Sequence, residues 1–79
     1  MLTPYIVNLA PFDKAKRQTI VSSMELMGYT GVHFKPDTDY AYMFLQGKSS
    51  KDVVATALSI SAEDVIDATG WDMVAWSHE

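Results

Sequence analysis

The chain contains no cysteine among its 79 residues. Disulfide bridges and thiolate zinc sites are therefore excluded, and the fold must be held by a hydrophobic core of marginal size. A cysteine-free chain suits a reducing compartment, so we expect a cytoplasmic protein, in the host cytoplasm if it is viral. Long apolar runs are also missing, and the chain starts without the basic and apolar regions of a secretory signal. We expect no membrane association.

Basic residues are scarce, because six lysines and arginines stand against ten acidic residues and give a formal net charge of −4. Duplex-binding domains usually carry a basic patch, since their affinity depends on neutralising phosphates. We therefore expect no binding to duplex DNA. Recognition of a single strand by stacking on aromatic rings stays open, because aromatic platforms contribute to that mode as well as charge.

Motifs for catalysis and cofactor binding are absent as well. The chain has no glycine-rich phosphate loop, no nucleophile elbow and no spaced carboxylate pair. His33 and His78 are the only histidines, and no partners for a metal or general-base role stand near them in the sequence. Asp37 and Asp39 lack the glycine and late glutamate of a calcium loop, so we interpret them as turn residues. We expect a non-enzymatic protein without metal or cofactor.

Two segments show the alternation of β-strands and are rich in aromatic residues: Tyr5–Leu9 and Tyr40–Gln46. Successive side chains of a strand point to opposite faces, so Tyr40, Tyr42 and Phe44 share one face. The other face of the second segment is apolar too. An antiparallel sheet in a small domain normally buries only one face. The surplus aromatic face is therefore a candidate binding surface.

The remaining elements follow from helical spacing, caps and turn residues. The predicted order begins with a strand at Tyr5–Leu9, a helix at Phe12–Met27 ended by a left-handed Gly28, and a strand at Val32–Phe34. A turn at Lys35–Asp39 then leads to a strand at Tyr40–Gln46. The rest is predicted to be a helix capped by Ser49 or Ser50 that breaks near Ile60, a further helical turn through Ala68, and a last strand at Trp71–Trp76. This order predicts one α+β domain over residues 1–79. Right-handed crossovers make it a ferredoxin-like βαββαβ two-layer sandwich, with a four-stranded antiparallel sheet and both helices on one face.

A shared core between helices and sheet is predicted from the apolar faces of these elements. Its members are Ile6, Ile20, Met24, Phe34, Met43, Leu45 and Leu58.

Two segments resemble the strand motifs of the RNA recognition motif (RRM) family. Tyr5-Ile6-Val7-Asn8-Leu9 is similar to the first-strand motif, and Thr38–Leu45 is similar to the third-strand motif. The resemblance implies an RRM-like fold that binds single-stranded RNA, with Tyr5, Tyr40 and Tyr42 as the base-stacking residues.

The chain departs from the RRM pattern where the family has a basic residue and a glycine, because Thr38 and Asp39 stand there. A carboxylate at this place has the wrong sign for an approaching phosphate. The order of strands and helices also has a weaker likeness to NusG-type N-terminal domains. That likeness implies a partner in the transcription machinery.

The aromatic face leads to two hypotheses. The first is a small inhibitory or regulatory protein that docks this face or a strand edge on another protein. Such a protein would be of the kind encoded as a phage accessory protein. Homodimerisation through this face is a variant of this hypothesis. The alternative is RRM-like binding of single-stranded RNA. We favour a protein partner, because the acidic balance disfavours only RNA. The expected partner-binding residues are Tyr5, Val7, His33, Tyr40, Tyr42, Phe44 and, with one register of the last strand, Val74 and Trp76.

Acidic residues form a further candidate surface, composed of Asp37, Asp39, Glu63, Asp64 and Asp67. Runs of this kind are usually solvated faces. They can also attract a basic partner through charge complementarity, and the sequence leaves both interpretations open.

Overall fold

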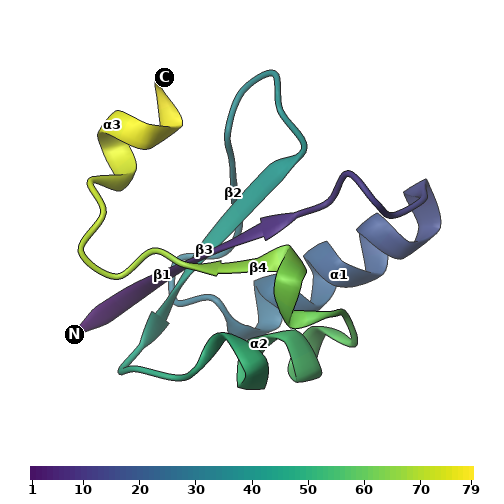
Figure 1. Ribbon diagram of the computed structural model, residues 1–79, viewed down its shortest axis with the longest axis horizontal. Helices are drawn as coiled ribbons and strands as arrows, with labels where there is room; N and C mark the ends of the chain where they lie inside the picture. Colours follow the sequence, from purple (N-terminus) through teal and green to yellow (C-terminus); the bar gives the residue numbers. More distant parts are fainter.

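The computed structural model describes all residues, 1–79. It is an α+β fold whose four-stranded antiparallel sheet has the order β2-β3-β1-β4, which is the ferredoxin-like arrangement predicted from the sequence (Figure 1). The elements are β1 (Leu2–Asn8), α1 (Lys14–Met27), β2 (His33–Phe34), β3 (Tyr40–Gln46), α2 (Lys51–Leu58), the 3₁₀ helix η1 (Ala62–Asp64), β4 (Val65–Asp67) and α3 (Met73–Ser77). No helix combines the length and the apolar character that a bilayer crossing requires.

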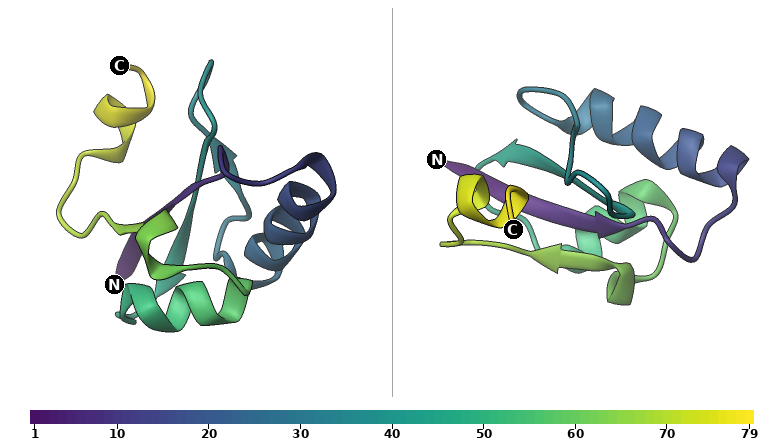
Figure 2. Two further views of the ribbon diagram at one scale, coloured as in Figure 1. Left: turned by 45° about the vertical axis from the view of Figure 1, so that its right-hand side comes forward. Right: turned by 90° about the horizontal axis from the view of Figure 1, so that it is seen from above.

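Helices α1 and α2 cover one face of the sheet, and the short helix α3 lies over the opposite face (Figures 1 and 2). The main core lies between the sheet and the first two helices. As predicted, it includes Ile20 and Met24 of α1, Met43 of β3 and Leu58 of α2, all buried. Leu45 is only partly buried at the margin of this core. The two-layer architecture is therefore confirmed, with α3 as an addition.

Side-chain caps fix where the main helices begin. The Asp13 carboxylate accepts a hydrogen bond of 2.8 Å from the backbone N–H of Lys16, and Ser50 caps α2 in the same way through Val53. Because Asp13 is the cap, α1 begins at Lys14 and not at Phe12. The predicted left-handed end at Gly28 is wrong, since its φ is −69°. Glycine is needed there because a Cβ atom would stand 2.6 Å from the carbonyl oxygen of Gly31.

The first strand has the opposite phase to the one predicted. Tyr5 lies opposite Met43 and Val7 opposite Ala41, whereas Ile6 lies opposite Tyr42. Opposite residues of an antiparallel pair point to the same face. Tyr5 and Val7 are therefore fully buried under α1 and α2, and Ile6 is buried on the other face, which reverses the predicted sides of all three. The strand also begins earlier than predicted, at Leu2, and ends at Asn8.

The last third of the chain differs most from the prediction. The expected helical turn through Ala68 is η1 followed by β4, whose Val65 and Ile66 are β-branched and pair with β1. The expected last strand at Trp71–Trp76 is wrong, because helix α3 (Met73–Ser77) occupies most of this segment. This helix begins after Asp72, whose carboxylate accepts a hydrogen bond of 3.1 Å from the N–H of Ala75.

The short strand β2 differs in a smaller way. It contains only His33 and Phe34, and Val32 precedes it as a partly buried neighbour of the main core. Phe34 does not belong to that core as predicted, because 57% of its surface is exposed. The strand is at the edge of the sheet, where the two main helices do not reach its side chain.

Candidate functional site

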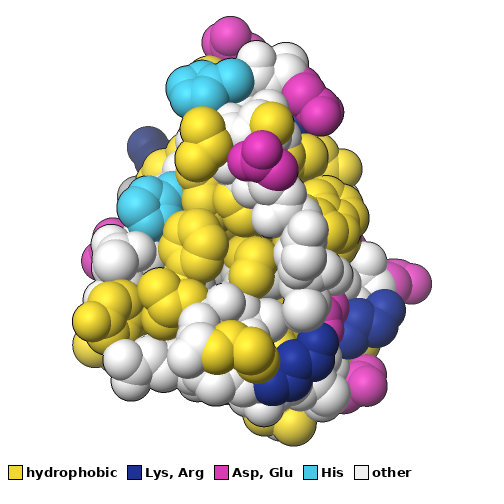
Figure 3. All heavy atoms as spheres, turned by 90° about the vertical axis from the view of Figure 1, so that its left-hand side faces the viewer, with side chains coloured by type: hydrophobic (Ala, Val, Ile, Leu, Met, Phe, Trp, Pro, Cys, Tyr) yellow, Lys and Arg dark blue, Asp and Glu magenta, His cyan; other side chains and the backbone are white.

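The outer face is the side of the sheet that α1 and α2 leave uncovered. Its buried centre is formed by Ile6, Ala68 and Met73. Partly buried side chains surround this centre, namely Tyr40, Tyr42, Phe44, Ile66 and Trp76. Figure 3 shows this side of the molecule, with hydrophobic side chains gathered across its middle.

Helix α3 covers one part of the outer face through Trp76. The indole packs edge-on against Tyr40, with ring centroids 5.9 Å apart, and against Tyr42 at 5.7 Å. Lys35, which directly follows β2, also contacts α3, and its ammonium lies 4.5 Å from the Trp76 ring centroid and 3.8 Å from a Glu79 carboxylate oxygen. Only 13% of the Lys35 side chain is exposed. These contacts hold α3 on the sheet.

A group of three rings occupies the part of the outer face beside α3, and we call it the open aromatic cluster. His33 stacks on Tyr42 at a centroid distance of 5.2 Å and meets Phe44 edge-on at 5.9 Å. Tyr42 and Phe44 also meet edge-on, at 6.0 Å. The Nε2 atom of His33 and the Thr30 hydroxyl share a hydrogen bond of 3.0 Å. All three rings are half-buried, so their exposed parts form a surface whose geometry is already fixed.

The structure brings most of the predicted partner-binding residues together. His33, Tyr40, Tyr42 and Phe44 lie on the outer face as expected, and Trp76 joins them from α3 rather than from a strand. Val74 of α3 is exposed and is not one of the side chains packed on this cluster. Sequence reasoning missed Ile6 and Met73, although an N-cap signal at Asp72 was available to reveal α3.

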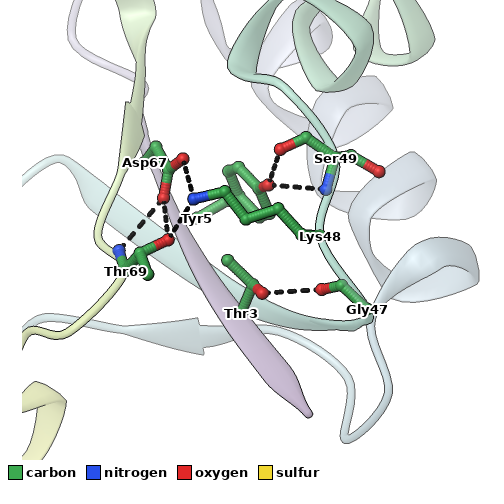
Figure 4. A network of polar contacts seen from close by, with 7 residues as sticks. All are labelled: Thr3, Tyr5, Gly47, Lys48, Ser49, Asp67 and Thr69. Carbon is green, nitrogen blue, oxygen red and sulfur yellow. Dashed lines mark hydrogen bonds and ion pairs between the residues drawn. The ribbon is translucent and has the colours of Figure 1, made fainter.

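Tyr5 and Val7 cannot contact a partner at this face, because both are fully buried on the helix side. The hydroxyl of Tyr5 has its hydrogen-bonding partners on the helix side of the sheet. Its hydroxyl donates a hydrogen bond to the carbonyl oxygen of Ser49 and accepts one of 3.1 Å from the Ser49 N–H (Figure 4). Tyr5 therefore joins β1 to the loop before α2. The RRM stacking set of Tyr5, Tyr40 and Tyr42 is not assembled on one face.

The neighbouring polar contacts also connect β1, this loop and β4 (Figure 4). Thr3 donates a hydrogen bond of 2.6 Å to the carbonyl oxygen of Gly47. The ammonium of Lys48 lies 2.9 Å from the Asp67 carboxylate and 2.8 Å from the Thr69 hydroxyl. Hydrogen bonds from the Thr69 hydroxyl, from Lys48 and from the Thr69 N–H lower the pKa of Asp67 to about 2. We assign this network a structural role.

The five predicted acidic residues do not form one surface. Asp37 and Asp39 lie in the loop between β2 and β3, whereas η1 and β4 carry the other three at a different part of the molecule (Figure 1). Asp39 forms an ion pair with Arg17 at 2.9 Å, and Asp67 pairs with Lys48. These contacts explain two of the acids as partners within the chain.

The chemistry of the outer face is that of contact between apolar and aromatic surfaces. No group of three or more histidine, cysteine, aspartate and glutamate side chains is placed to hold a metal ion. Comparisons of the chain with protein-family models, with curated proteins and with solved structures find no match.

Proposed function

We propose that this chain is a small non-catalytic binding protein that docks its outer face on a protein partner and thereby regulates or inhibits it. The observation that carries the proposal is the open aromatic cluster of His33, Tyr42 and Phe44. Its three rings pack on one another and remain partly exposed beside α3. Apolar surfaces of this kind on a small domain commonly mark an interaction site.

The kind of side chain favours a protein as the partner. Tyrosine and tryptophan are enriched among the few residues that dominate protein interfaces, and Tyr42 and Trp76 lie in contact here. The packing of His33 and Phe44 on Tyr42 restricts the rings before binding. Less conformational entropy is then lost when the partner arrives.

RNA binding is less well supported by the same face. Of the three expected stacking residues, Tyr5 is buried on the opposite side of the sheet, and Tyr40 and Tyr42 already pack against Trp76. The net charge of −4 disfavours phosphates as well.

The direct test compares Phe44→Ser with Val53→Ser, a change of an exposed residue on α2 at the other side of the molecule. Tagged wild-type protein and both variants are used to capture partners from the source cell, with quantitative mass spectrometry. We expect a partner whose recovery falls with Phe44→Ser and not with Val53→Ser. Its affinity for the purified Phe44→Ser protein should fall by about 2 kcal/mol, the scale of an interface hot spot.

Melting temperatures of both variants serve as the folding control. Equal recovery of every captured protein by wild type and a folded Phe44→Ser variant would contradict the proposal. Light scattering and a titration with mixed single-stranded RNA at low salt complete the test. A dimer that Phe44→Ser dissociates would identify a second copy as the partner, and Phe44-dependent RNA binding would replace the proposed function.

A further inference from the structure

An open pocket of about 490 Å³ lies along α3 and the residues that precede it. Its lining is formed by Trp71, Asp72, Ala75, Trp76 and Glu79. Both tryptophans of the chain are therefore in its wall, together with two carboxylates. The volume falls in the usual range for ligand pockets in proteins. Trp71 is not a core residue, since 46% of its surface is exposed.

The combination of indole rings and carboxylates is suited to a positive group. The face of an indole ring attracts cations, and tryptophan does so more strongly than the other aromatic side chains. The chain itself provides an example next to the pocket, because the Lys35 ammonium lies 4.5 Å from the Trp76 ring centroid and 3.8 Å from Glu79. Lys35 is not part of the pocket lining, so its own charge does not occupy that space.

Asp72 supplies a carboxylate that no cation of the chain neutralises. One of its oxygens accepts the capping hydrogen bond from Ala75, and Asp72 takes part in none of the three ion pairs of the molecule. Since Glu79 already pairs with Lys35, Asp72 is the carboxylate of the pocket that is open to an added positive group. The overall charge of −4 acts in the same direction over longer distances.

We propose that this pocket binds an arginine side chain of the protein partner. Arginine fits the lining better than lysine, because its planar guanidinium can stack on an indole while it donates hydrogen bonds to a carboxylate. The inference rests on the proposed function, since Trp76 belongs both to the pocket and to the outer face. It narrows the partner to a protein that presents an exposed basic segment beside an apolar patch.

The experiment is an NMR titration of the ¹⁵N-labelled protein with two short peptides, acetyl-Gly-Arg-Gly-Arg-Gly-amide and its citrulline counterpart. Citrulline keeps the shape of arginine and removes its charge. The indole N–H signals of Trp71 and Trp76 report directly on the pocket, because they are the only tryptophans. We expect saturable shifts of both signals, and binding of the arginine peptide about fivefold tighter than that of the citrulline peptide.

Two variants locate the binding. Trp71→Ala should weaken the arginine peptide about fivefold. Asp72→Asn should weaken it as well while the helix stays capped, because asparagine is also a favoured N-cap residue. Glu63→Gln, a change of an exposed acid on η1, is the matched control and should leave the affinity unchanged.

Equal affinity for the two peptides, no detectable binding, or an Asp72→Asn protein that binds like wild type would overturn the inference. Its failure is distinguishable from failure of the proposed function. If the peptides do not bind and Phe44→Ser still loses the captured partner, only the arginine pocket is wrong. If the arginine peptide binds through Trp71 and Asp72 while Phe44→Ser keeps every partner, the pocket stands and the proposed docking face is wrong.

Discussion

At the scale of single residues, the hydroxyl of Tyr5 can be removed with little other change to the structure. Tyr5→Phe keeps the buried ring and leaves the N–H and carbonyl groups of Ser49 without their partner. We expect the free energy of unfolding to fall by about 1–2 kcal/mol in urea denaturation. Tyr29→Phe is the matched control, because Tyr29 is exposed and should tolerate the same change. Similar losses in the two variants would contradict a structural role for the Tyr5 hydroxyl.

Asp67 gives a prediction about pH. Its pKa is lowered from 3.8 to about 2 by hydrogen bonds from the Thr69 hydroxyl, Lys48 and the Thr69 N–H. The ionised carboxylate therefore contributes stability above its unfolded pKa, and this contribution disappears as the pH falls through about 2. The stability difference between wild type and Asp67→Asn should be constant well above pH 3.8 and shrink as the pH falls from there toward about 2. A difference that does not change over this range would show that the native pKa is not lowered, and carbon NMR titration of Asp67 measures it directly.

At the scale of elements, the end of α1 depends on a close backbone approach at Gly28. A Cβ atom at this position would lie 2.6 Å from the Gly31 carbonyl oxygen and 3.0 Å from that of Met24. Gly28→Ala should lower the free energy of unfolding by about 1–3 kcal/mol, because the chain must shift to admit the methyl group. Ser22→Ala, at an exposed position of α1, should be neutral or slightly stabilising. Thermal unfolding of the two variants distinguishes these results.

Helix α3 is stabilised by Trp76, which packs on Tyr40, Tyr42 and Lys35. Trp76→Ala should therefore lower the free energy of unfolding by about 2 kcal/mol, somewhat less than for a fully buried tryptophan. Val74→Ala is the control on the same helix, because Val74 is exposed. For the same reason, changing Tyr40 and Tyr42 together to serine should lower the melting temperature, whereas an uncovered face would tolerate the change. An unchanged melting temperature in Trp76→Ala would mean that α3 does not pack on the sheet in solution.

The elements also show what the sequence can and cannot specify. Strand β3 and the caps of α1 and α2 are local signals, and the predicted positions agree with the structure at Tyr40–Gln46 and Ser50. The phase of β1 is not local, because both of its faces are apolar and a shift by one residue exchanges them. Long-range contacts distinguish the two phases, namely the hydrogen bond between Tyr5 and Ser49 and the packing of Ile6 on the α3 side of the sheet.

The same limit applies to the outer face as a site. Its ring cluster was predictable from the alternation of Tyr40, Tyr42 and Phe44 in one strand. The contribution of α3 was signalled only by the cap residue Asp72, because the apolar run Met73–Trp76 suits a short strand as well, and packing on the sheet decides between strand and helix.

At the scale of the whole molecule, the two faces of the sheet have different environments. Helices α1 and α2 cover one face completely enough to bury Tyr5, Val7 and Met43. The other face has only the short α3, and the open aromatic cluster stays partly exposed beside it. We propose that this uneven covering serves recognition, so that partners approach the outer face and not the helices.

Photo-crosslinking tests this claim most directly. A benzophenone amino acid replaces Phe44 on the outer face in one version of the protein and Val53 on α2 in another. Both versions are irradiated in the source cell after their melting temperatures have been checked. We expect a specific protein adduct from position 44 and none from position 53. Adducts from position 53 alone, or the same adducts from both positions, would contradict it.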